Sequence, residues 1–154
     1  MSKSSVTAEE IAELVERNRE AAAAYIRGNM RRYLELVKAS EDYTLMSPFG
    51  GETVHGSDES DEAVEATSRF FRGGEADLEI EQAYTSGQMV VLVGVERQHG
   101  EVGGLPDQDW SLRVTLVFRR EGSQWQLVHR HADPLVHGID MEQLSVLARG
   151  QDPG

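Results

Sequence analysis

The spacing of apolar residues changes its period near residue 76, and that change limits the fold more than any other feature. Up to about residue 72, apolar residues recur at the spacing of helices that bury one face. From residue 76 they alternate with polar residues, as in strands with one face in water. Helices followed by a run of strands predict an α+β domain in which helices pack on an antiparallel sheet.

Three helices are expected in the first half of the chain. Thr7 and Glu10 have the spacing of a capping box, which predicts a helix start after Thr7. Gly28–Asn29 is expected to break this helical stretch into two helices. Ser57 or Ser60, each followed by acidic residues, is a start signal for the third. The residues expected to be helical are 7–39 and 58–72.

The strands are bounded by proline and glycine. A first short strand, Tyr43–Met46, is expected to stop at Ser47-Pro48-Phe49-Gly50-Gly51. After Gly73–Gly74 ends the third helix, four strands should form a meander, with a loop at 100–109. Asp140 is expected to cap a last helix before a polar tail. The meander strands are expected at 76–84, 89–99, 110–119 and 125–133, and the last helix at about 140–149.

Length and composition predict one domain over residues 1–154, with its core at about 7–137. The formal net charge of -12 disfavours nucleic acids and anionic membrane surfaces as partners. The chain has no cysteine, which excludes disulfides and thiolate sites. It also has no apolar run of membrane-spanning length, and a cytoplasmic protein is expected.

The last strand carries the residues with the most evident chemistry. Strand alternation places His129, His131 and Asp133 on one face, together with Trp125 and Leu127. A histidine beside a carboxylate is an acid/base pair, so His131 and Asp133 are candidate catalytic residues. The alternative is a structural role at a sheet or subunit contact. A metal site is not expected, because three alternate residues on one strand span about 13 Å.

The register of the last hairpin decides which arginine points inward. A three-residue turn at 121–123 would place Arg113 and Thr115 beside His131 and His129, whereas a shift of one residue would bring Arg130 next to Thr115. An inward arginine suggests an anionic or carbonyl-bearing ligand, or a partner such as Asp133. The alternative is an arginine in solvent.

The order helix, helix, strand, helix and meander resembles the nuclear transport factor two-like superfamily, over about residues 7–137. The sharpest matches are Gly28–Asn29, Ser47-Pro48-Phe49-Gly50, and the segment 119–133 with Trp125-Gln-Leu-Val-His129-Arg-His131. This last segment is similar to the SnoaL-like branch. The resemblance implies a cone-shaped, curved antiparallel sheet, also called a cystatin-like roll, whose three N-terminal helices enclose a pocket.

Ketosteroid isomerases of this superfamily have three catalytic residues that this chain lacks. Their general-base aspartate precedes the Pro-Phe-Gly segment, where this chain has Ser47. Their oxyanion-hole tyrosine corresponds to Ala21, and their protonated aspartate falls near Val114 or Thr115. Isomerisation by that mechanism is therefore not expected here.

The resemblance leads to the hypothesis of a small-molecule pocket protein without a cofactor. It would act as an isomerase, cyclase or dehydratase by proton transfer on a partly apolar carbonyl compound, with His131 and Asp133 as acid and base and Arg113 or Arg130 polarising an oxygen. The alternative is a non-catalytic ligand-binding or oligomerisation domain. The expected ligand-binding residues are Tyr25, Tyr43, Met46, Phe49, Phe70, Trp110, Thr115 and Arg130.

Assembly as a homodimer is also expected. Superfamily members commonly pair through the open face of the sheet, and this sheet carries Phe118, Leu127 and tryptophans with no further helices to cover both sides. If the protein is a monomer, the last helix around Leu144 is the expected cover.

Overall fold

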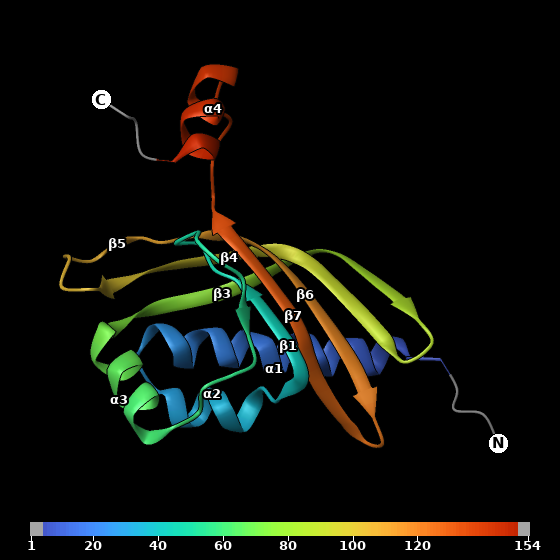
Figure 1. Ribbon diagram of the computed structural model, residues 1–154. Coiled ribbons are helices and arrows are strands. Elements are labelled where there is room, and N and C mark those ends of the chain that lie inside the picture. The colour runs from blue at the N-terminus through green and yellow to red at the C-terminus, as the bar shows by residue number, and fades with distance from the viewer. Residues whose placement is uncertain (1–4, 151–154) are drawn as a thin grey trace.

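A computed structural model describes residues 5–150 of the chain. Three helices precede most of the sheet, and a fourth follows it (Figure 1). The helices are α1 (Ala8–Ile26), α2 (Met30–Leu36), α3 (Asp61–Phe70) and α4 (Met141–Arg149). The strands are β1 (Ala39–Met46), β2 (Val54–His55), β3 (Phe71–Ser86), β4 (Met89–Val102), β5 (Gln108–Asp109), β6 (Leu112–Glu121) and β7 (Gln124–Pro134). Most of the expected polar tail lies outside the described residues.

Each helix begins at a residue that the sequence marks as a cap. Thr7 and Glu10 form the expected capping box of α1. The side chain of Asn29 accepts a hydrogen bond from the Arg32 amide at the start of α2. The side chain of Ser60 accepts one from the Ala63 amide at the start of α3. These caps satisfy amides that a helix start leaves without partners, so the expected boundaries are confirmed to within a few residues.

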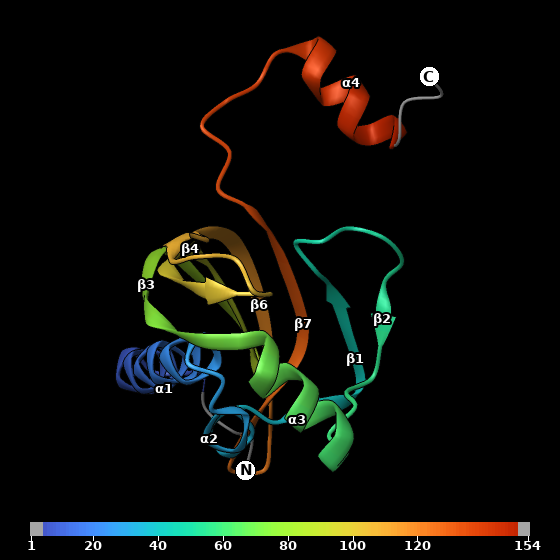
Figure 2. The same cartoon turned by 90° about the vertical axis from the view of Figure 1, so that its left-hand side faces the viewer.

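The sheet has seven strands in the order β2-β1-β7-β6-β4-β3, with β5 paired to β4. It curves around α1 and α2, and α3 lies beside its open end (Figures 1 and 2). All its strand pairs are antiparallel except β1 with β7, which are parallel. The expected α+β fold with a curved sheet is confirmed, and the parallel pair of β1 and β7 departs from the expected antiparallel pattern.

The core lies between α1, α2 and the inner face of this sheet. Leu14 of α1, Leu92 of β4 and Leu116 of β6 are each at most 3% exposed and belong to one apolar cluster. Arg17 reaches from α1 to the backbone of α2, and Arg19 donates to the Leu78 carbonyl of β3. The two N-terminal helices are therefore fixed on the sheet by both apolar packing and side-chain hydrogen bonds.

The third strand begins earlier than the glycines predict. It starts at Phe71, directly after α3, and Gly73–Gly74 lies inside it. A side chain at Gly74 would place its Cβ 2.0 Å from the His99 carbonyl oxygen of β4. Gly74 thus allows the close approach of two strands, and neither glycine ends the helix.

The β6–β7 hairpin differs from both expected registers. Glu121 pairs with Gln124 across a two-residue turn, and a bulge then shifts the ladder by one residue. Beyond the bulge, Thr115 pairs with His131 and Arg113 with Asp133. The bulge adds one residue to β7, so residues before and after it no longer follow a single alternation.

As a consequence, the expected single face of β7 is wrong. Leu127 is 2% exposed and packs in the core, whereas His129 and His131 lie on the outer face of the sheet. Arg130, between the two histidines, points inward. The bulge therefore decides which β7 side chains reach the interior.

The last helix stands apart from the rest of the fold. Asp140 caps α4 as expected, and a capping box with Gln143 completes its first turn. An extended arm separates α4 from the sheet, and every residue from Val136 to Gly150 is exposed (Figure 2). Among the described residues, no helix is long and apolar enough to cross a membrane.

We expect Gly28→Ala to destabilise the fold strongly. Gly28 has φ +76°, and an added Cβ would lie 2.2 Å from the Phe71 carbonyl oxygen. Backbone strain and this overlap should together lower the free energy of unfolding by about 3 kcal/mol. The control is Gly87→Ala, because Gly87 has φ +56° with open space around its Cβ position.

The control should lose only about 1 kcal/mol. Urea unfolding of both variants measures the difference. Equal losses would show that the contact between the α1–α2 turn and Phe71 is not tight.

Candidate functional site

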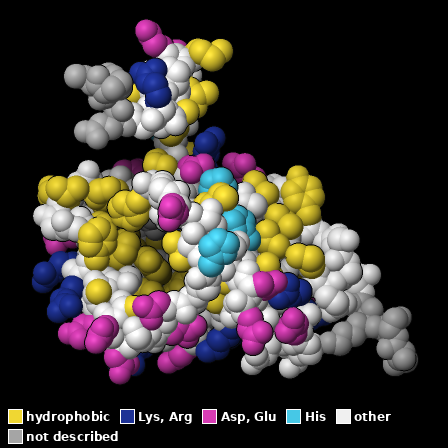
Figure 3. Space-filling model, in the orientation of Figure 1, with side chains coloured by type: hydrophobic (Ala, Val, Ile, Leu, Met, Phe, Trp, Pro, Cys, Tyr) yellow, Lys and Arg dark blue, Asp and Glu magenta, His cyan; other side chains and the backbone are white. Residues whose placement is uncertain are grey.

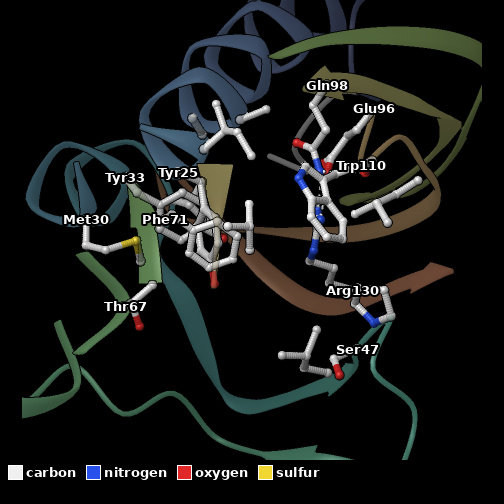
Figure 4. A pocket seen from close by; sticks show the side chains of 18 of the residues that line it. Tyr25, Met30, Tyr33, Ser47, Thr67, Phe71, Glu96, Gln98, Trp110 and Arg130 are labelled. Carbon is white, nitrogen blue, oxygen red and sulfur yellow. Dashed lines mark hydrogen bonds and ion pairs between the residues drawn. The ribbon is translucent and has the colours of Figure 1, made fainter. Parts of the chain in front are cut away.

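A cavity of about 1070 Å³ lies between the inner face of the sheet and the three N-terminal helices. Figure 3 shows its mouth as a hollow surrounded by hydrophobic side chains, and Figure 4 shows its interior. Its rim contains residues of the β1–β2 loop, α3, the β4–β5 loop and the arm after β7. A cavity of this size accommodates an organic molecule of several rings.

An ion pair between Glu96 and Arg130 lies in the wall of this cavity (Figure 4). Arg130 Nη2 is 2.6 Å from Glu96 Oε1, and Nη1 is 3.1 Å from Oε2. Glu96 lies on β4 and Arg130 on β7, so the pair spans the intervening strand β6. The Glu96 side chain is 7% exposed and that of Arg130 is 22% exposed.

Arg130 stays charged within this pair. Burial alone would lower the pKa of Arg130, but the adjacent Glu96 carboxylate more than offsets this and raises it above its ordinary value. The bidentate geometry occupies both carboxylate oxygens. The pair therefore adds no net charge to the cavity and leaves Glu96 poorly placed to accept a proton.

Three tyrosines from different elements face the same cavity: Tyr25 of α1, Tyr33 of α2 and Tyr43 of β1. Tyr25 packs edge-on against Tyr33 and Phe71, with ring centroids 5.1 and 4.8 Å away. Burial raises the pKa of each tyrosine, so all three hydroxyls remain protonated near neutral pH. Within residues 5–150, none of these hydroxyls has a protein hydrogen-bond partner.

The wall opposite the tyrosines is held by Gln98 and Trp110 (Figure 4). Gln98 Nε2 donates to the Trp110 carbonyl over 3.0 Å, and the Trp110 indole nitrogen donates to the Gly100 carbonyl over 2.9 Å. Because its polar atom is already bonded, the Trp110 ring offers a fixed apolar surface to a ligand.

Charged groups at the mouth are mostly acidic. Asp58, Glu59 and Asp109 line the cavity and are exposed. Arg97 lines it too, but its guanidinium is bonded to Glu79. Negative charge thus dominates the entrance, in line with the whole chain.

The structure places six of the eight expected ligand-binding residues in this cavity. They are Tyr25, Tyr43, Phe49, Phe70, Trp110 and Arg130. The other two lie on the outer face of the sheet, where Thr115 and Met46 both pair with His131. Their expected position in the pocket is wrong, because both follow the outward alternation of their strands.

The three expected catalytic residues also lie on the outer face. His131 Nε2 is 3.3 Å from Asp133 Oδ2, so the two do meet, and Arg113 stands opposite Asp133 in the ladder. None of the three lines the cavity. The sheet separates them from it, because the β7 bulge turned Arg130 inward and its neighbours outward. His129, next along, bonds Thr44 on the same outer face.

Sequence reasoning missed Glu96, Tyr33 and Gln98 as cavity residues. A signal for Glu96 was present, because it continues the inward alternation of Val90 and Leu92 along β4. A carboxylate on an otherwise apolar face indicates a nearby buried cation, because an unpaired buried charge is costly. Ser47 and Ala21, which replace catalytic residues of the isomerases, both line the cavity.

We expect Glu96→Gln to destabilise the protein by about 3 kcal/mol, because it leaves the Arg130 charge without its carboxylate in the wall of the cavity. The matched control is Glu79→Gln, which removes the carboxylate of the exposed Arg97 pair on β3 and β4. That change should cost about 0–1 kcal/mol.

Urea unfolding gives both values, and the double variant Glu96→Leu with Arg130→Met should regain much of the lost stability. If Glu96→Gln costs no more than the control, the pair does not determine the stability of the inner wall.

Comparison with known proteins shows the family of this chain. The family model for the SnoaL-like domain matches residues 14–136. No curated protein matches the chain.

Solved structures with the same fold are numerous. One is a putative dehydratase of the NTF2-like family from Streptomyces avermitilis, with 18% identity and a TM-score of 0.63, covering 83% of this chain and 95% of that one. Another is a putative calcium/calmodulin dependent protein kinase II association domain from Xanthomonas campestris, with 18% identity and a TM-score of 0.59, covering 90% and 97%. A cystatin-like domain of unknown function from Nostoc punctiforme has 15% identity and a TM-score of 0.64, covering 94% and 86%.

At these identities the structures show the fold alone. The family model covers most of the chain, and the neighbours carry the expected superfamily name. This chain therefore belongs to the SnoaL-like domain family, and its fold is that of the NTF2-like structures.

Proposed function

We propose that the cavity binds an uncharged, partly apolar organic molecule that carries a carbonyl or hydroxyl oxygen. The observation that carries this proposal is the set of tyrosine hydroxyls without protein partners, beside an arginine whose charge is already neutralised. These hydroxyls are accessible from the cavity and have no protein partner within residues 5–150, so a ligand oxygen can accept a hydrogen bond from them.

The rest of the wall supports the same ligand class. Tyr25, Phe71 and Trp110 present aromatic surfaces, and Met30 adds a thioether. These groups stabilise flat apolar rings by burial and by offset contacts between aromatic systems. The ligand would therefore place its rings between the aromatic walls and an oxygen among the tyrosines.

An anionic ligand is disfavoured, although an inward arginine first suggests one. Glu96 already occupies both guanidinium nitrogens that face it. An incoming anion would pass Asp58, Glu59 and Asp109 at the mouth and would lie close to the Glu96 carboxylate. Both effects oppose a second negative charge.

A proton-transfer reaction in the cavity is the second candidate. One structural neighbour is a putative dehydratase, and a tyrosine hydroxyl that donates to a carbonyl oxygen would polarise that carbonyl. Such a reaction also requires a base, and Glu96 is held by Arg130. The pair of His131 and Asp133 lies across the sheet from the cavity. Binding is therefore the leading proposal.

We expect neutral 2-acetylnaphthalene to bind the protein more tightly than anionic 2-naphthoate, which has the same ring system. Calorimetry with each probe measures this difference. Tyr43→Phe should weaken binding of the ketone by about 2-fold to 10-fold, because it removes one hydrogen-bond donor but keeps the ring. Tyr84→Phe is the matched control, because Tyr84 lies outside the cavity and is 57% exposed.

Tighter binding of the carboxylate would contradict the proposed ligand class. Equal affinities of Tyr43→Phe and the control would show that the hydroxyl does not contact the ligand oxygen.

We also propose that the protein pairs with a second copy through the outer face of the sheet. Tyr84, Met89 and Met46 on the outer side are 57%, 38% and 43% exposed, and Val91, Val93 and Val117 lie between them. Figure 3 shows this hydrophobic surface beside the histidines of the sheet. The last helix, the expected cover in a monomer, does not pack on it (Figure 1). An apolar sheet face of this kind is typical of an interface.

We expect sedimentation at micromolar concentration to give a dimer, and Val117→Lys to convert it to a monomer, because it places a charge on this face. Val136→Lys, in the exposed arm, is the control and should leave the dimer unchanged. A monomeric wild-type protein would contradict this proposal.

A further inference from the structure

The C-terminal helix presents an apolar face that nothing in the described chain covers. Met141, Leu144 and Leu147 recur at helical spacing along one side of α4 and are 82%, 54% and 68% exposed. Glu142 and Arg149 lie on another side. A helix with so much exposed apolar surface gains stability when that surface is buried.

The rim of the cavity presents a second exposed apolar surface. Phe49 is 77% exposed, Leu105 is 52%, Val54 is 47% and Phe70 is 41%. All four line the cavity, and they come from the β1–β2 loop, β2, α3 and the loop before β5. The rings of Phe49 and Phe70 contact each other edge-on across the mouth, with centroids 6.2 Å apart.

The arm between β7 and α4 begins at this rim. The Leu135 amide is bonded to the Ser111 carbonyl, and both Leu135 and His137 line the cavity. Only three residues separate His137 from Met141, so the start of α4 stays within about 14 Å of His137 in any conformation of the arm. Gly138, with φ +96°, lies within this short segment and gives it freedom to turn.

We propose that α4 folds over the mouth of its own cavity and packs Met141, Leu144 and Leu147 on the apolar rim. The structure shows the open arrangement, in which the arm holds α4 away from the rim (Figure 2). Closure buries two exposed apolar surfaces at once. The short tether favours the chain's own rim over that of a second copy, because it keeps the local concentration of α4 high. The closed form would exclude water from a bound molecule.

The absence of cysteine makes a spin-label experiment direct. A nitroxide on Glu142→Cys, outside the apolar face of α4, broadens the amide NMR signals of nearby residues. In the ligand-free protein we expect loss of intensity for rim residues such as Gly50, Gly51 and Leu105. Gly87, in the β3–β4 turn away from the rim, should keep its intensity.

Two variants test whether the apolar face drives closure. Leu144→Glu together with Leu147→Glu should restore the rim signals. Val146→Glu should not, because Val146 lies on the opposite side of the helix. Intact rim signals in the labelled wild-type background would overturn the proposal, as would the same broadening in both variants.

A mixed sample identifies the occupant of the rim. Spin-labelled protein without ¹⁵N is combined with ¹⁵N-labelled protein that carries no spin label. Closure within one chain is supported if the rim signals are undiminished in this mixed sample but broadened in the sample whose chains carry both the spin label and ¹⁵N. Rim broadening in the mixed sample would instead show that α4 packs on a second copy, and it would overturn the assignment to the chain's own cavity. This test uses no ligand, so it is independent of what the cavity binds.

Discussion

The buried ion pair between Glu96 and Arg130 is the interaction on which the interior of this protein depends. It joins β4 to β7 across β6 and supplies the only close carboxylate that Arg130 has within the described residues. A guanidinium in this position is tolerated only with such a partner. The pair also sets the chemistry of the cavity, because a neutralised arginine leaves recognition of the ligand to the tyrosines. The same two side chains thus join β4 to β7 and determine which ligands the cavity selects.

Much of the fold was predictable from local signals, and the site was predictable only in part. The caps at Thr7 and Asp140 and the break at Gly28 act within a few residues, so their outcome does not depend on the rest of the chain. The face of β7 could not be read in the same way. The bulge in β7 depends on how the strand fits β6, and it reverses the alternation on which the placement of His131 and Arg130 relied. Because of one inserted residue, His131 and Asp133 lie on the outer face of the sheet and Arg130 lies in the cavity wall.

The same reasoning explains why apolar residues were easier to place than polar ones. Tyr25, Phe70 and Trp110 were assigned to the cavity because large aromatic rings gather wherever a sheet and helices leave space between them. Glu96 follows the inward alternation of β4, yet the sequence alone gives no reason to pair it with Arg130, which lies on a strand that is not its neighbour. The pairing requires the strand order, and the strand order follows from packing of the whole sheet.

The cavity combines a rigid interior with a less constrained entrance. Its inner wall is built from strands and from α1 and α2, and Gln98, Trp110 and the ion pair hold it by hydrogen bonds. Its rim is made of loop residues, a short helix and the arm, where side chains such as Phe49 and Leu105 are largely exposed. Local stability therefore differs between the inner wall and the rim, so the inner wall can stay preorganised while the rim moves. Affinity would then be set by the inner wall, and the rates of entry and release by the rim. A single sheet can in this way separate the choice of ligand from the control of access to it.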